Sequence, residues 1–177
     1  MSVEMTIHGM AQEPGSGNPL IVLKEKERER YLFIGVGPLE ISAIATAAMG
    51  VPRPRPMTHD LLCSALEACG ARITEAVIHA LVDGIFHARL VLDVQGRHAE
   101  LDSRSSDAIA VAMRVGIPVH AEEAVLERAG ITPGTGAGDD ADRPGGQERI
   151  DEEQLDAFRD AIKGLNLDDL GRPGPAS

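Results

Sequence analysis

The sequence predicts an α+β domain followed by an acidic C-terminal tail, and three observations lead to this class. Short apolar runs rich in strand-forming residues alternate with helix-like segments rich in alanine and isoleucine. The order strand, strand, strand, helix occurs twice along the chain. Glycine, proline and acidic residues dominate after residue 130, where the apolar content is too low to build a core.

The two copies of this order align with each other. A shift of 66 positions places residues 31–50 on residues 97–116 without a gap, with strand on strand and Gly50 on Gly116. We interpret the match as an internal duplication of a strand-strand-strand-helix unit. Because solenoids need three or more short repeats, two copies of this size predict one pseudo-symmetric domain.

The first half of the domain is expected to begin with strand 3–10 and a loop of turn residues at 12–19. Apolar runs at 20–23 and 31–36 predict a hairpin, and the alternating charges between them suit a solvated tip. Pro38 suits the first turn of a helix that ends at Gly50. Prolines at every second position of 51–57 then enforce an extended linker.

The second half is expected to start with a helix at 59–70, capped by Thr58. Its predicted buried stripe consists of Leu61, Leu62, Ala65, Leu66 and Cys69.

Long strands at 72–81 and 85–94 follow this helix, and Asp83-Gly84 between them is a strong hairpin signal. A third strand at 97–101 leads into a polar corner at 102–107, after which small apolar residues predict a helix that ends at Gly116. A strand at 117–120 and a helix at 122–129 complete the domain.

The predicted domain therefore spans residues 1–130. Residues 131–150 are expected to form a disordered linker, because this stretch is rich in glycine and acids. Apolar residues at helical spacing predict a short amphipathic helix within 151–170, and residues 171–177 are expected to be a disordered end.

Composition limits the function classes. The formal net charge is −11, from 17 Lys and Arg against 28 Asp and Glu, and the chain has one Tyr, three Phe and no Trp. Proteins that bind nucleic acid tightly usually neutralise several phosphates with Lys and Arg or stack bases on aromatic rings. Any binding of nucleic acid is therefore expected to be weak.

The chain is expected to be soluble and cytoplasmic. No apolar run approaches the ~20 residues that a membrane helix needs, and the N-terminus lacks the features of a signal peptide. Cys63 and Cys69 do not share a helix face, and we expect both to be reduced thiols.

Several motifs in order resemble the bifunctional nuclease domain family over roughly residues 3–130. They are the opening hairpin, Pro38-Leu39-Glu40 before an alanine-rich helix, the run from Arg55 to Leu62, Asp83-Gly84, and the run from Asp102 to Ala110. One departure is Arg104-Ser105-Ser106-Asp107, where the family usually has Arg-Pro-Ser-Asp. The resemblance implies a compact α+β domain, self-association into homo-oligomers, and nuclease activity towards DNA and RNA. It brings no established catalytic set, so the site is argued from the residues.

Hydrolysis of a phosphodiester needs an activated water, stabilisation of charge on the phosphate and, commonly, Mg²⁺ held by two or more carboxylates. Asp102 and Asp107 are the candidate catalytic carboxylates and are expected to share Mg²⁺ or Mn²⁺ with Glu40. Glu40 matches Ser106 in the duplication and is therefore expected nearby. His59 is the candidate base.

The candidate groups for binding the substrate phosphate are Arg53, Arg55, Arg104 and Ser106, the last with help from a helix N-terminus. No organic cofactor is expected.

Two alternatives stay open. In the first, Asp102 and Asp107 cap the helix and pair with Arg104 as a purely structural cluster. In the second, which belongs to a different class, the chain is a non-enzymatic binding or regulatory module whose acidic tail and terminal helix recruit a partner.

Overall fold

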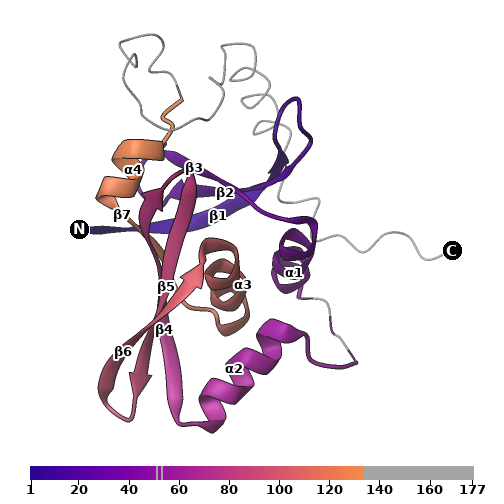
Figure 1. Cartoon of the computed structure of the whole chain (residues 1–177), viewed down its shortest axis with the longest axis vertical. Helices are drawn as coiled ribbons and strands as arrows, with labels where there is room; N and C mark the ends of the chain where they lie inside the picture. The colour runs from indigo at the N-terminus through magenta and orange to yellow at the C-terminus, as the bar shows by residue number, and fades with distance from the viewer. Residues whose placement is uncertain (51, 53, 134–177) are drawn as a thin grey trace, which may run out of the picture.

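A seven-stranded sheet flanked by helices forms the part of the chain that the computed structural model describes, which is residues 1–50, 52 and 54–133 (Figure 1). The predicted α+β class is confirmed. The predicted linker at 131–150 is described only up to residue 133, and Ile131 pairs with Tyr31 of the sheet through two backbone hydrogen bonds. The rest of this linker, the predicted helix within 151–170 and the predicted end at 171–177 lie outside the described residues, as does Arg53. The structure describes one chain, so the expected homo-oligomer stays a prediction.

The elements follow the chain in an order that repeats itself. They are β1 (Ser2–Gln12), β2 (Pro19–Glu25), β3 (Tyr31–Gly35), α1 (Pro38–Ala48), α2 (Thr58–Ala68), β4 (Ala71–Val82), β5 (Ile85–Val94), β6 (Arg97–Arg104), α3 (Ser105–Val115), β7 (Val119–Glu122) and α4 (Glu123–Ala129).

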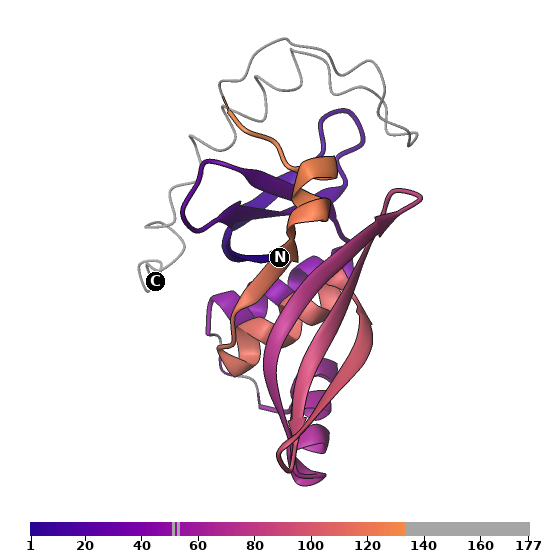
Figure 2. The ribbon, with the colours of Figure 1, turned by 90° about the vertical axis from the view of Figure 1, so that its left-hand side faces the viewer.

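The strand order in the sheet is β3-β2-β1-β7-β4-β5-β6. All neighbours are antiparallel except β4 and β7, which are parallel. Figure 1 shows α1, α2 and α3 together on one side of the β4–β6 half of the sheet, and Figure 2 shows that half standing in front of them. Helix α4 lies beside the other half, next to β7.

The repeated order is visible as β1-β2-β3-α1 and β4-β5-β6-α3, with α2 between the two units. The shift of 66 positions places β3 on the start of β6, and α1 on α3. Both units begin with an antiparallel three-strand meander. The arrangement agrees with a duplication, which remains a prediction.

The hairpin between β4 and β5 turns at Asp83-Gly84, as expected. Both residues have positive φ, 49° and 76°, which a tight hairpin turn requires and which glycine adopts without strain.

Helix α3 is the central helix of the structure. Its Ala108, Ile109, Ala110, Val111 and Ala112 are each at most 2% exposed. It packs on α1 and on the sheet, where it shares one core with side chains of β2, β4 and β5. The two ends of α3 are therefore fixed by a buried middle.

The expected polar corner at 102–107 is wrong, because its first half belongs to β6 and its second half is the first turn of α3. Strand β6 continues to Arg104, which pairs with His87 of β5, and α3 begins directly at Ser105. Because β6 is an edge strand with mostly exposed residues, its side chains can be polar without forming a loop.

The predicted buried stripe of α2 and its predicted cap are also wrong. None of its residues is buried, and Leu61 is 63% exposed. The N-cap is Met57 and not Thr58, and the Met57 backbone N–H donates to Oδ2 of Asp60 over 2.7 Å. Helix α2 therefore lies on the outside of the core, with its apolar side chains only partly covered.

Among the described residues, no helix combines the length and the apolar character that crossing a bilayer would require.

The packing of α1 predicts that two of its apolar residues contribute very differently to the free energy of unfolding. Ile44 is fully buried, whereas Leu39 is 82% exposed. Ile44→Ala should lower the free energy of unfolding by about 2–5 kcal/mol, because it leaves a cavity in the core. Leu39→Ala is the matched control and should change it by less than about 0.5 kcal/mol. Urea unfolding followed by circular dichroism measures both, and equal losses would contradict the described packing of α1.

Candidate functional site

Three helices carry an acidic side chain at the third position of their first turn. These side chains are Glu40 in α1, Asp60 in α2 and Asp107 in α3. A carboxylate at this position interacts favourably with the helix dipole and can accept from the backbone N–H of the N-cap residue, as Asp60 does from Met57. The local sequence thus explains why each carboxylate sits at a helix start.

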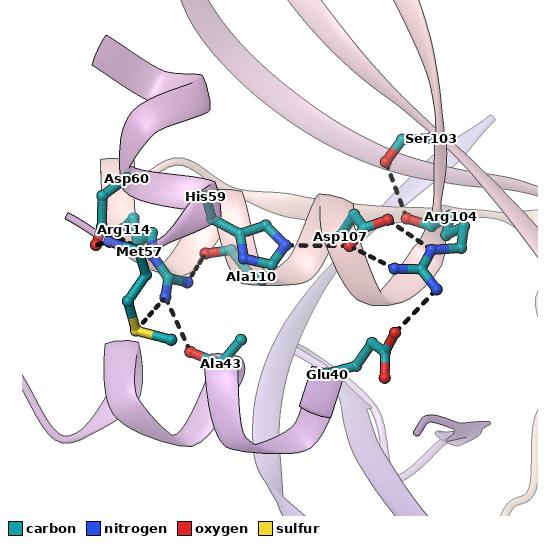
Figure 3. Close-up of polar contacts among 10 residues, drawn as sticks. All are labelled: Glu40, Ala43, Met57, His59, Asp60, Ser103, Arg104, Asp107, Ala110 and Arg114. Atoms are coloured by element: carbon teal, nitrogen blue, oxygen red, sulfur yellow. Dashed lines mark hydrogen bonds and ion pairs between the residues drawn. The ribbon is translucent and has the colours of Figure 1, made fainter. Parts of the chain in front are cut away.

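Four side chains from these helix starts meet in one cluster (Figure 3). Nε2 of His59 lies 3.0 Å from Oδ1 of Asp107. Arg104 donates to Asp107 from Nε over 2.7 Å and from Nη2 over 3.0 Å. Its Nη1 donates to Oε1 of Glu40 over 2.9 Å. We call Glu40, His59, Arg104 and Asp107 the dyad cluster, after its His59–Asp107 pair.

Charge and burial differ across the dyad cluster. Partial burial by itself would raise the pKa of the Asp107 carboxyl, but the hydrogen bonds from Arg104 and His59 outweigh burial and hold that pKa below its usual range. The same carboxylate, followed by Glu40, raises the pKa of Arg104. The His59 side chain is 14% exposed and that of Arg104 is 66% exposed. The cluster therefore holds an ionised carboxylate and a charged guanidinium that solvent can reach.

Asp102 lies apart from this cluster. It is on β6, directly opposite Arg89 of β5. Cross-strand partners share one face of a sheet and successive residues alternate. Leu90 of the core lies opposite Leu101, so Asp102 points to the other face, away from the helices. The structure therefore does not bring Asp102 to His59 and Asp107.

The other predicted phosphate-binding residues have different surroundings. Ser106 is buried in the first turn of α3, where a polymer would not reach its hydroxyl. Arg55 lines a groove of about 440 Å³ between the end of α1, the start of α2 and the end of α3. Met57 and Asp60 line the same groove, and His59 of the dyad cluster lies between these two residues and Asp107. Arg55 could therefore contact a substrate that extends away from His59.

The dyad cluster does not suit a divalent cation as it stands. Within the described residues, no three His, Cys, Asp or Glu side chains form a group that could hold a metal ion. The guanidinium of Arg104 binds both oxygens of Asp107 and one of Glu40, where a cation would need its ligands. A cation would have to displace Arg104, and Asp102 is not placed to assist.

Part of the structural alternative also agrees with the geometry, because Arg104 does pair with Asp107. It does not pair with Asp102, which has no polar partner from a side chain in the described part of the chain. Arg104 and Asp107 thus hold the start of α3 together and leave His59 as a group that helix capping does not explain.

Sequence reasoning misses two residues of this region, Asp60 and Arg114. Nε of Arg114 donates to Oδ1 of Asp60 over 2.6 Å, and its side chain is only 9% exposed. The position of Asp60 in a first helical turn suggests dipole compensation and no particular partner. The sequence does contain one signal for Arg114. It stands in the last turn of an apolar helix, seven residues after Asp107, and this spacing places both side chains on the same helix face.

The fold and the dyad cluster define an α+β protein in which a histidine, two carboxylates and an arginine meet at the starts of three helices. The chain belongs to the bifunctional nuclease domain family, whose model matches residues 21–134. Membership suggests a nuclease-like function and a nucleic acid as the partner.

Two relatives come from Mycobacterium tuberculosis: "Uncharacterized protein MT1877" of strain CDC 1551 / Oshkosh and "Uncharacterized protein Rv1829" of strain H37Rv. Each is 34% identical to this chain over 167 residues, which cover 94% of this chain and 97% of the relative. Their names state no activity, so the functional information comes from the family.

The lowered pKa of Asp107 predicts a pH dependence of stability. An aspartate of an unfolded chain titrates near pH 4, and in the folded protein Asp107 titrates lower. Its contacts therefore contribute stability that is complete above about pH 4 and is lost as the pH falls through the folded pKa. Asp107→Asn should lower the thermal unfolding midpoint at pH 7, and its difference from the wild type should shrink as the pH falls from about 5 to 3.

The matched control is Asp102→Asn, which removes an exposed carboxylate outside the dyad cluster. At pH 7 it should change the free energy of unfolding by less than about 0.5 kcal/mol. If Asp107→Asn had no larger effect than this control, the contacts of Asp107 would not stabilise the fold.

Proposed function

We propose that this protein is a nuclease of low sequence specificity that hydrolyses phosphodiester bonds of DNA or RNA at the dyad cluster. The single observation that carries the proposal is the His59–Asp107 pair beside the exposed guanidinium of Arg104. Family membership supports the reaction class, and the geometry of the dyad cluster supports the choice of these groups.

The tautomer of a neutral His59 follows from its partner. The lowered pKa keeps Asp107 ionised near neutral pH, so its carboxylate can only accept hydrogen bonds. Nε2 of a neutral His59 must then carry the proton, and Nδ1 has the free lone pair. In the described structure Asp107 is the only hydrogen-bond partner of this ring. Nδ1 can therefore act as a general base, an effect that typically contributes about 10²–10⁴-fold.

The proposed reaction is a displacement at phosphorus. An attacking water transfers a proton to Nδ1 of His59 as its oxygen bonds to phosphorus, and the bond from phosphorus to the leaving oxygen breaks. The proton on His59 then passes to the leaving oxygen. Asp107 stabilises the imidazolium that exists between these steps.

Arg104 is the proposed phosphate contact. It is the most exposed member of the dyad cluster, and guanidinium groups bind phosphate oxygens through two parallel hydrogen bonds. A phosphate would compete with Glu40 and Asp107 for its donors. Together with the net charge of −11, this competition predicts weak binding that falls further as salt rises.

Arg55 is proposed to hold a flanking phosphate in the neighbouring groove, since it is exposed there and has no ion-pair partner among the described residues. The predicted Mg²⁺ or Mn²⁺ enters the proposal only through its test, because Arg104 occupies the carboxylates that would ligate it.

The experiment measures cleavage of single-stranded RNA and DNA by the purified full chain. His59→Gln and Asp107→Asn should each reduce kcat by about 10²-fold or more, because they remove the base or its orienting partner. Arg104→Gln should mainly raise KM. Parallel reactions with EDTA, Mg²⁺ and Mn²⁺ show whether a cation contributes.

His98→Gln and Arg97→Gln on the exposed edge of β6 are the controls and should keep wild-type rates. If His59→Gln cleaves at the wild-type rate, the proposal is wrong, because contamination or another site would then be responsible.

A further inference from the structure

Helix α2 carries the proposed base but is not held by a buried apolar face. None of its residues is buried, and only partly covered side chains such as Leu62, Cys63 and Leu66 touch the core. Apolar contacts of this kind are not directional and tolerate sliding. The position of His59 therefore needs another constraint.

Arg114 in the last turn of α3 supplies directional contacts to all three helices (Figure 3). Its Nε donates to Oδ1 of Asp60 in α2 over 2.6 Å, and Nη1 donates to the carbonyl of Ala110 in α3 over 2.8 Å. Nη2 donates to the carbonyl of Ala43 in α1 over 3.1 Å. A planar guanidinium in this position fixes the distances between the three backbones at one point.

Asp60 connects Arg114 to the start of α2. Its Oδ2 accepts the backbone N–H of Met57, and this bond, ahead of the Arg114 contact, lowers the pKa of the carboxyl. Asp60 thus joins Arg114 to the residue where α2 begins. His59, its neighbour in the sequence, lies in the same turn.

The two contacts between the start of α2 and α3 form a clamp. His59 meets Asp107 in the first turn of α3, and Asp60 meets Arg114 in its last turn. Asp107 and Arg114 are seven residues apart, which is two helical turns and about 10 Å along the axis. Two attachment points at this separation prevent α2 from pivoting about either one.

We infer that Arg114, acting through Asp60, is a positioning residue that holds His59 at hydrogen-bonding distance from Asp107. This inference rests on the proposed function for its catalytic meaning. Arg114 itself touches neither the proposed base nor the phosphate. Its side chain is 9% exposed and its described donors are already bonded within the protein.

The test compares Arg114→Gln, Asp60→Asn and the double variant in the full chain. A displacement of about 1 Å can cost about 10²-fold in rate, so each single variant should lower kcat by about that factor with KM within about twofold. The double variant should lose no more than the worse single one, because both changes break the same contact.

A second readout follows the ring of His59 directly, by two-bond ¹H–¹⁵N correlation spectra assigned with His59→Gln. The wild type should show one tautomer with the proton on Nε2, as the bond to Asp107 requires. Arg114→Gln and Asp60→Asn should show averaging between tautomers. A residue that only stabilises the fold would not change this signature in the folded protein.

The matched control is Arg30→Gln. Arg30 is similarly covered, at 14% exposure, and bridges Glu25 of β2 and Glu123 of α4 in the other half of the sheet. It should lower the unfolding midpoint comparably and leave kcat and the His59 spectrum unchanged.

The outcomes separate the two proposals. A wild-type chain without nuclease activity overturns the proposed function, while the His59 spectrum still decides whether Arg114 positions the ring. Unchanged spectra and kcat in Arg114→Gln overturn the positioning role. If Arg114→Gln does not fold, Asp60→Asn tests the same role, because it keeps the buried arginine bonded to two carbonyls.

Discussion

Burial of α3 is the constraint on which the rest of the structure depends. Five consecutive side chains of this helix are buried almost completely, and three of them are alanines. Small side chains allow α1 to pack closely on one side of α3 while the sheet packs on another, and dense packing leaves little freedom to slide. Both ends of α3 are fixed as a result. The buried apolar middle of α3 therefore fixes the positions of Asp107 at its start and Arg114 near its end.

Helix α2 depends on α3 in a different way, through polar contacts. The Asp60–Arg114 ion pair is only partly buried, with Arg114 9% and Asp60 36% exposed. Such a pair contributes little net stability, because desolvation and screening by water offset most of the attraction. The pair instead restricts orientation, because the planar guanidinium forms its hydrogen bonds in only a few geometries. Asp60 and Arg114 therefore specify where α2 sits more than they stabilise the fold. Apolar burial places α3, and hydrogen bonds then place α2 on it.

The sequence carries enough information for the fold class, the hairpin at Asp83-Gly84 and the start of α1, because these depend on local patterns. It predicts α3 but places its start after residue 107, whereas the helix begins at Ser105. Glu40 was expected near the start of α3 from the aligned copies, and it does contact Arg104 there. The polar run around Asp102 predicts a loop although this residue lies in β6, because an edge strand exposed to water has the same polarity as a loop. The partial burial of α2 depends on tertiary packing, and the Asp60–Arg114 contact joins residues that are 54 positions apart. No local sequence pattern encodes either one.

Arg104 and a divalent cation would use the same oxygens in this site. Mg²⁺ requires ligands at about 2.1 Å in an octahedral arrangement, whereas a guanidinium needs the same carboxylate oxygens at 2.7–3.0 Å. The two cannot bind together, so the chemistry at Asp107 depends on which one is present. Arg104 is exposed enough to turn towards an incoming phosphate. Under the proposed function, a phosphate that attracts Arg104 away from both Glu40 and Asp107 would leave Asp107 with His59 as its remaining partner, which is the arrangement that proton transfer at His59 needs.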